Sequence, residues 1–241
     1  RLRVVHAASH GTYGSPRLQR ALRDAGIRVG RNRVIRLMRV EHLAGRPRPR
    51  FRVTTDPDPA AVAWPNLLHR RFAVPAPNRV WAADITALST REGWLYLAVV
   101  LDLCSRRVVG WSTADAARSP LCSDALKMAI ARRHPPAGLL HHSDRGCQYT
   151  SDAYQHTLKA LGIQCSMSRT GCCYDNAVME RFFWSLKYEW TNHQELANLQ
   201  DARLSVFQYI ETFYNSQRMH QTLGFVSPNQ FEAHHAANVA A

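Results

Sequence analysis

Three short segments in the middle of this 241-residue chain decide its fold and most of its chemistry. Residues 81–86 read WAADIT, residues 141–146 read HHSDRG and residues 175–183 read DNAVMERFF. Asp84 lies inside an apolar, β-prone run, Asp144 follows a second short apolar run, and Glu180 lies in a long helical pattern. A carboxylate within an apolar strand is costly unless a cation pairs with it. The sequence therefore predicts a metal as the partner of Asp84.

The metal expected at these carboxylates is Mg²⁺ or Mn²⁺, bound as two ions by Asp84, Asp144 and Glu180. Mg²⁺ prefers oxygen ligands in an octahedral shell and usually keeps several waters. Two such ions, roughly 3.5–4 Å apart, can activate an attacking oxygen and stabilise a leaving oxygen at a phosphodiester. A single Asp in a strand is more often a solvated edge residue, but three carboxylates in this order and context are far harder to obtain by chance.

The spacing of the acidic residues carries a family resemblance. Thirty-five residues separate Asp144 from Glu180, and with the segments DIT (84–86), SDRG (143–146) and DNAVME (175–180) this resembles the DD(35)E signature of retroviral integrases and transposases. The closer resemblance is to bacterial insertion-sequence transposases of the IS-three family, second reading frame. The tail 214–228, which reads YNSQRMHQTLGFVSP, is similar to that family's pattern, and the likeness runs from Tyr13 to about Phe231.

This resemblance implies a DNA transposase whose catalytic and metal-binding residues are Asp84, Asp144 and Glu180. Such an enzyme cleaves DNA strands at the element ends with water and then joins the freed 3′-hydroxyl to target DNA. It works without a covalent protein–DNA intermediate. Two rivals stay open on the sequence alone: a nuclease of the same fold that only hydrolyses DNA, and a degenerate transposase that survives as a DNA-binding protein.

The order of expected elements after residue 79 is βββαβαβα. We expect strands at 79–88, 94–103, 106–113, 139–143 and 163–167, and helices at 119–133, 151–161, 175–192 and 200–215. The first three strands are joined by short turns and should be antiparallel, whereas the later strands alternate with helices and should be parallel. This order resembles the ribonuclease-H-like fold of integrase cores, an α/β class with a mixed five-stranded sheet flanked by helices.

The positive charge is concentrated ahead of the catalytic segments. The net charge is +13, and residues 1–80 contain 17 arginines and 4 acidic residues, which accounts for the whole excess. Helices expected at 17–25, with Ser15 as a cap, and at 31–40 flank a turn at Gly26, and this arrangement resembles a helix-turn-helix. We expect three regions: 1–45, helix-turn-helix-like and basic; 46–78, a basic proline-rich linker; and 79–235, the catalytic core.

DNA is the expected partner, as element terminal repeats and as target, because a concentrated basic block favours phosphate-rich ligands. A solvated basic face is the alternative. Candidate DNA-binding residues come from the basic block, the loops beside Asp144 and Gly171, one helix face and the tail: Arg31, Arg33, Arg36, Arg48, Arg50, Arg145, Ser168, Arg169, Asn176, Lys187, Arg218 and His220. The resemblance also implies a homo-oligomer on DNA and a possible upstream-frame helix-turn-helix partner.

Other features narrow the class of protein. The sequence shows no membrane span or signal peptide, and six cysteines without paired CxxC spacing favour reduced thiols, so we expect a cytoplasmic, nucleoid-associated protein. Because the chain opens on Arg1, we expect a fragment of a longer protein. Asp102 is expected to be structural, paired with Arg106 or Arg107, although a fourth metal ligand is the alternative. His141 and His142 are expected to be buried and hydrogen-bonded, and Trp184 is either a core aromatic or part of the DNA-facing helix surface.

Overall fold

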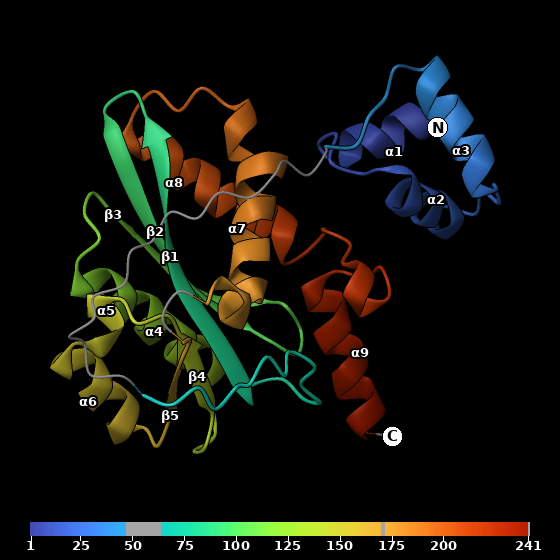
Figure 1. The fold of residues 1–241 in the computed structure, drawn as a ribbon. Coiled ribbons are helices and arrows are strands. Elements are labelled where there is room, and N and C mark those ends of the chain that lie inside the picture. Colours follow the sequence, from blue (N-terminus) through green and yellow to red (C-terminus); the bar gives the residue numbers. More distant parts are fainter. Residues whose placement is uncertain (47–63, 170–171, 241) are drawn as a thin grey trace.

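The centre of the molecule is a mixed five-stranded sheet (Figure 1). The computed structural model describes residues 1–46, 64–169 and 172–240. The strands are β1 (Val80–Thr90), β2 (Gly93–Asp102), β3 (Val108–Ala114), β4 (Leu140–Ser143) and β5 (Gln164–Met167), in the order β3-β2-β1-β4-β5. β1, β2 and β3 are antiparallel, whereas β4 and β5 run parallel to β1. The expected mixed sheet is confirmed.

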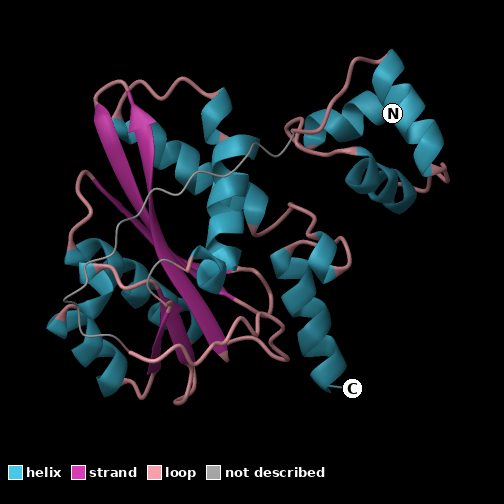
Figure 2. Cartoon of the chain, in the orientation of Figure 1, coloured by secondary structure: helices cyan, strands magenta, loops and turns pink. Residues whose placement is uncertain are grey.

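Helices cover both faces of this sheet (Figure 2). The first face packs against α4 (Ser119–Arg133), α5 (Cys147–Thr150) and α6 (Asp152–Ala160), and the second packs against α7 (Ala177–Glu189) and α8 (Leu199–Phe207). Alternation along β1 divides the side chains between the two cores, since Trp81 and Ala83 join the first and Ala82 and Leu88 join the second. Asp84 has the parity of Ala82, and it therefore points to the α7 face.

α4 lies very close to β3. A Cβ atom built on Gly110 would come within 2.2 Å of the Ala125 carbonyl oxygen, so only glycine allows this approach. α4 ends at Arg133, and the next residue, His134, adopts a left-handed conformation before Pro135.

The basic N-terminal region forms three helices, namely α1 (Leu2–Ala8), α2 (Ser15–Asp24) and α3 (Arg31–Val40). The sequence predicted α2 and α3 but not α1. These helices share a small core, which consists of Tyr13, Leu18, Leu22, Val34 and Met38. The expected Ser15 cap is wrong, because Ser15 is already helical and Gly14 holds the cap position. Gly26 follows α2 with a φ of +78°, as expected for the residue after a helix.

The C-terminal part departs most from expectation. The helix expected at 200–215 is α-helical only to Phe207 and continues as a π-helix over Gln208–Tyr214. A further helix, α9 (Pro228–Ala240), follows, and its Glu232 pairs with Arg107 and Arg133 at 2.6 and 2.8 Å. Three 3₁₀ segments, Cys173–Asn176, Thr191–His193 and Gln221–Leu223, connect the helices. In the residues described, no helix has the length and apolar character needed to cross a membrane.

Candidate active site

The candidate site lies where β1, the end of β4 and α7 meet. Asp84 is in the middle of β1, directly opposite Val99 of β2, and its Oδ1 accepts a hydrogen bond from the Ile85 amide at 2.8 Å. The side chain is half-buried and projects toward the face that α7 covers. The ladder to β2 holds Asp84 in register, and the ladder to β4 fixes β1 up to Ala82, two residues before it.

Asp144 directly follows β4, which lies beside β1. Its Oδ1 accepts a hydrogen bond from the Gly146 amide at 2.9 Å, and this bond closes a tight turn around the carboxylate. A Cβ atom on Gly146 would lie 3.1 Å from that same oxygen, so glycine leaves the carboxylate room. Asp144 lies two residues beyond His142, so it continues the alternation of β4 on the same side as that residue. The turn leaves the Asp144 side chain half-buried beside Asp84.

α7 brings Glu180 and Lys187 to the same place. The Asn176 side-chain amide donates to the Ala83 carbonyl at 3.3 Å, which ties the start of the helix to β1 one residue before Asp84. Glu180 and Lys187 are two turns apart on the face that follows Asn176. Both are close enough to Asp84 for their charges to change its pKa in opposite directions.

The electrostatics of these groups suit a cation. Burial and the neighbouring carboxylates of Asp144 and Glu180 raise the pKa of Asp84 well above its usual range, while the Ile85 amide and Lys187 oppose the shift. Burial also raises the pKa of Asp144. Within the described residues, no three or more His, Cys, Asp and Glu side chains are grouped tightly enough to hold a metal ion as they stand. The donors are nevertheless the oxygen type that Mg²⁺ prefers, and a cation would relieve their repulsion.

A buried ion cluster fixes the chain that leads into α7. The Asp175 carboxylate is fully buried and accepts hydrogen bonds from Arg70 at 2.7 Å, from Arg169 at 3.0 Å and from Asn66 at 2.9 Å. These arginines hold the pKa of Asp175 far below its usual range, although burial opposes them. Asp175 belongs to the segment DNAVME (175–180), but no role was predicted for it. Its partners lie as many as 109 positions away in the chain, so no local pattern indicates this ion cluster.

The structure separates the candidate DNA-binding residues into two groups. Arg31, Arg33 and Arg36 are exposed along α3, Arg169 is exposed beside Asp175, and Arg145 and Lys187 are half-buried near the carboxylates; their contact with DNA stays a prediction. Arg48 and Arg50 lie outside the described residues.

Ser168, Asn176 and Arg218 are buried and bonded within the protein, and their contact with DNA stays a prediction. Ser168 bonds His142 at 3.1 Å and Asn176 bonds the Ala83 carbonyl. Arg218 is only 2% exposed and donates to Glu189 at 2.5 and 2.6 Å. His220 is half-buried and lies 3.1 Å from Arg218, so it belongs to the same structural cluster.

Asp102 is structural, but its expected arginine partners are wrong. It is fully buried and accepts hydrogen bonds from the backbone amides of Asn78 at 2.6 Å, Cys104 at 2.9 Å and Ser105 at 3.0 Å. Arg106 donates instead to the Phe72 carbonyl, and Arg107 donates to Glu232. The Asp102 carboxylate needs neither arginine, because the backbone amides of the surrounding turns already bond it.

The buried histidines are confirmed. His141 lies 2.9 Å from the Tyr154 hydroxyl, and His142 lies 2.8 Å from the Ser166 hydroxyl. Trp184 is half-buried beside Arg181 on α7 and is therefore not a core aromatic, while its part in a DNA-facing surface of this helix stays a prediction.

A ribonuclease-H-like sheet with carboxylates at its centre, preceded by a basic three-helix region, defines the class of integrase-core proteins that act with DNA-binding domains. The description "integrase core domain" matches residues 74–173 and, in a second form, 161–228, and "HTH-like domain" matches residues 1–51. Among solved structures, a simian T-cell lymphotropic virus intasome in complex with PP2A regulatory subunit B56 gamma matches with a TM-score of 0.55 at 18% identity, covering 96% of this chain and 74% of that chain.

A second solved structure, the HTLV-2 integrase catalytic core domain in complex with magnesium, matches with a TM-score of 0.50 at 19% identity over 65% of this chain and 97% of that one. Curated relatives are much more similar. Transposase InsF for insertion sequence IS3A of Escherichia coli (strain K12) is 43% identical over 232 residues, 95% of this chain and 81% of that protein. The transposase for insertion sequence element IS904 of Lactococcus lactis is 39% identical over 236 residues, which are 98% of this chain and 93% of that protein. The chain belongs to the IS3 family of insertion-sequence transposases.

Proposed function

We propose that this chain cleaves DNA strands at the ends of an insertion element and transfers them to target DNA, with Asp84, Asp144 and Glu180 as the metal-binding catalytic residues. The observation that carries the proposal is that Asp144 and Glu180, distant in sequence, lie close enough to Asp84 in β1 for their charges to raise its pKa. Family membership supports the same activity, because the relatives are named transposases.

The residues have separate roles in this proposal. Asp84 and Asp144 would hold the divalent metal together, and Glu180 would complete the shell from α7. When bound, Mg²⁺ or Mn²⁺ would supply Lewis-acid activation of the attacking oxygen and charge stabilisation at the phosphodiester. Lys187 lies near Asp84 and would contact a DNA phosphate beside the site. Through its hydrogen bond to the Ala83 carbonyl, Asn176 would hold the start of α7, and with it Glu180, in a fixed position relative to β1.

The DNA would be held by a larger surface than the site itself. The exposed arginines of α3 would bind the element's terminal repeat, and Arg145 and Arg169 would contact a strand close to Asp144. The proposed location is the cytoplasm at the nucleoid, and an upstream-frame protein is a possible further partner. These contacts would position the phosphodiester, while the carboxylates perform the chemistry.

The test uses DNA from the ends of the element that encodes the chain, with Mg²⁺ present. We expect nicking at the ends and, with a pre-cut 3′-hydroxyl end, joining to target DNA. Asp84→Asn, Asp144→Asn and Glu180→Gln should each reduce both activities about a thousandfold, because a metal contributes several kcal/mol of transition-state stabilisation. Asp124→Asn, at an exposed carboxylate on α4, is the matched control.

DNA binding measured by gel shift should be unchanged in all four variants. Near-normal joining by any one of the three site variants would remove that residue from the proposed site. Hydrolysis without any joining of pre-cut ends would show a nuclease rather than a transposase.

A further inference from the structure

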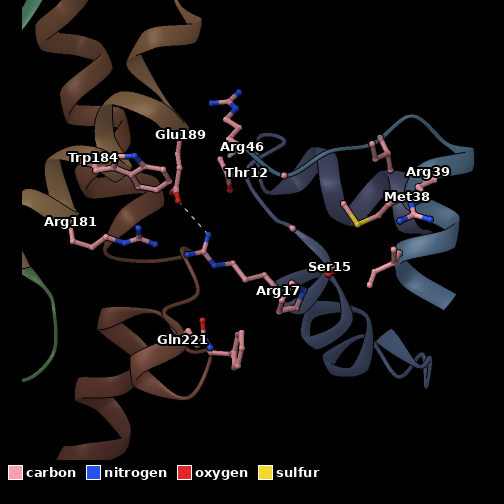
Figure 3. Close-up of a pocket in the computed structure, with 16 residues that line it drawn as sticks. Thr12, Ser15, Arg17, Met38, Arg39, Arg46, Arg181, Trp184, Glu189 and Gln221 are labelled. Atoms are coloured by element: carbon pink, nitrogen blue, oxygen red, sulfur yellow. Dashed lines mark hydrogen bonds and ion pairs between the residues drawn. The ribbon is translucent and has the colours of Figure 1, made fainter. Parts of the chain in front are cut away.

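A cleft of about 480 Å³ lies between the N-terminal three-helix region and α7 (Figure 3). Arg17, Arg39 and Arg46 come from the N-terminal side, and Arg181, Trp184 and Glu189 come from α7. It is separate from the carboxylate site, although Arg181 directly follows Glu180 in the chain. We call it the interdomain cleft.

The two walls of the interdomain cleft are held together along one side. The Tyr13 hydroxyl donates to the Gln217 carbonyl at 3.2 Å and accepts from the Met219 amide at 3.0 Å. The His10 ring packs edge-on against Trp190 and Phe213, with centroids 4.7 and 5.3 Å apart. Because these contacts join segments about 200 residues apart, the cleft is a built feature of this arrangement.

The interdomain cleft has an excess of positive charge. Four arginines and one glutamate line it, and that Glu189 is already bound by Arg218 with two short hydrogen bonds. Arg17 is 3.4 Å from Glu189, a longer contact than either bond from Arg218. Burial lowers the pKa of both Arg17 and Arg46, although the Glu189 carboxylate opposes the shift in each. An anion in the cleft would complete this balance.

The size and shape of the interdomain cleft select a small anionic group with a flat part. Its volume is within the range of roughly 300–1,000 Å³ that small-ligand sites occupy, which is too small for a DNA duplex. The Arg181 guanidinium lies 4.5 Å from the centroid of the Trp184 ring, and Trp184 stacks on Tyr188 at 5.7 Å. Guanidinium planes and aromatic rings are surfaces on which unpaired bases stack.

We propose that the interdomain cleft binds one unpaired nucleotide of a DNA strand, with its phosphate on the arginines and its base on the surface that the Arg181 guanidinium and Trp184 present to the cleft. This inference rests on the proposed function, since it takes DNA as the substrate. A strand held there would be fixed at once by the N-terminal region and by the helix that carries Glu180. The cleft would therefore favour DNA ends with a single-stranded extension over blunt duplex.

The experiment measures fluorescence anisotropy of labelled element-end DNA in EDTA, so that no cleavage occurs. Blunt duplex is compared with duplexes that carry a short single-stranded extension on the 5′ or the 3′ strand. We expect the extension on one strand to increase affinity about tenfold, the effect of one base stacked on an aromatic or guanidinium surface. Arg181→Ala and Arg46→Ala should each remove most of that gain while leaving blunt-duplex affinity unchanged. Arg203→Ala, at an exposed arginine on α8, is the matched control and should keep the gain.

The proposal is overturned if wild-type protein binds extended and blunt DNA equally, or if Arg181→Ala and Arg46→Ala keep the gain. Loss of the gain in Arg203→Ala would also overturn it, since general charge would then explain the effect. A cleavage assay distinguishes failure of this proposal from failure of the proposed function. If the protein favours extended DNA in EDTA but never cuts it in Mg²⁺, the nucleotide site in the cleft stands and the transposase activity is contradicted. If the protein binds neither DNA, both proposals are contradicted.

Discussion

His141 and His142 are held neutral inside the sheet. Burial lowers the pKa of His141 to about 3 and that of His142 to about 4, with the Asp175 carbonyl partly opposing the shift at His142. Their rings serve as hydrogen-bond partners for Tyr154 and Ser166, so they brace β4 immediately before Asp144. A charged ring at either position would have no solvent to stabilise it.

We therefore expect stability to fall with acidification through these histidines. In the unfolded chain a histidine binds a proton below about pH 6.5, whereas in the folded chain both stay neutral down to about pH 4. The unfolded state then binds more protons, so the free energy of unfolding decreases as pH falls, by about 1.4 kcal/mol per pH unit for each histidine. Urea unfolding between pH 6 and 5 should show a slope smaller by that amount in His142→Gln. His156→Gln, at an exposed residue of α6, should keep the wild-type slope.

At the level of single residues, the resemblance to the DD(35)E signature predicted Asp84, Asp144 and Glu180 as one site, whereas periodicity alone placed Asp84 in a strand and Glu180 in a helix. Burial was not predictable in the same way. Arg218 lies in a family-like segment of the tail, yet Glu189 and Ser185 enclose it. Those partners come from a helix some 30 positions earlier, and nothing local in the tail reveals them.

α7 is held at both ends. Asp175 and Asn176 fix its start against Arg70, Arg169 and β1, while Glu189 fixes its end against Arg218. Glu180 is five residues beyond the Asp175 ion cluster, so the position of its carboxylate depends on that cluster.

Asp175→Ala tests this dependence. Hydrogen bonds to charged groups contribute about 1.5–3 kcal/mol each, but Arg70 and Arg169 are partly exposed and would be resolvated, so we expect a net loss of about 2–4 kcal/mol in unfolding free energy. Strand transfer should also require more Mg²⁺, because Glu180 would be held less tightly. Asp201→Ala, which removes an exposed carboxylate from α8, is the control for a general effect of charge. An unchanged Mg²⁺ requirement in a folded Asp175→Ala protein would contradict the positioning role.

The sheet and the longer helices were predictable because their apolar periodicity is strong. α1 and α9 were missed since α1 has no fully buried residue and the apolar residues of α9 do not gather on one face of the helix. The π-helix after Phe207 is set by packing, where Tyr209, Ile210, Phe213 and Tyr214 all reach the core. No local sequence rule distinguishes that winding from an ordinary helix.

Across the whole molecule, the positive charge and the carboxylates proposed for catalysis lie in different parts of the chain. The excess charge lies in residues 1–80, and the carboxylates lie beyond it. The contacts of Tyr13 and Arg17 with the C-terminal part nevertheless join the two. Because they link positions as many as 206 residues apart, this docking could not be predicted from the sequence.

The salt dependence of DNA binding should show how many phosphate contacts the N-terminal arginines make. Deleting residues 1–60 should weaken binding and flatten its salt dependence while leaving the core folded. Replacing Arg31, Arg33 and Arg36 with glutamine is the sharper change, since these side chains are exposed and the fold does not use them. Each lost phosphate contact should reduce the slope of log K against log salt by about 0.9. The same three replacements at Arg91, Arg132 and Arg203 are the control. An unchanged slope in the α3 variant would show that α3 does not anchor the duplex.

Assembly is the remaining question at this scale. An element has two ends, and each end needs an active site beside the same target, whereas one chain offers a single set of Asp84, Asp144 and Glu180. We expect at least two chains to act on paired ends, with assembly on DNA rather than in solution. Complementation tests this: Asp84→Asn protein, which binds but cannot cut, is mixed with the α3 variant described above, which can cut but binds poorly. Joining should recover in the mixture and stay absent in each protein alone, and a mixture that contains Asp84→Asn in both partners should not recover. Joining of both ends by a complex sized, by light scattering, as one chain per pair of ends would contradict shared action.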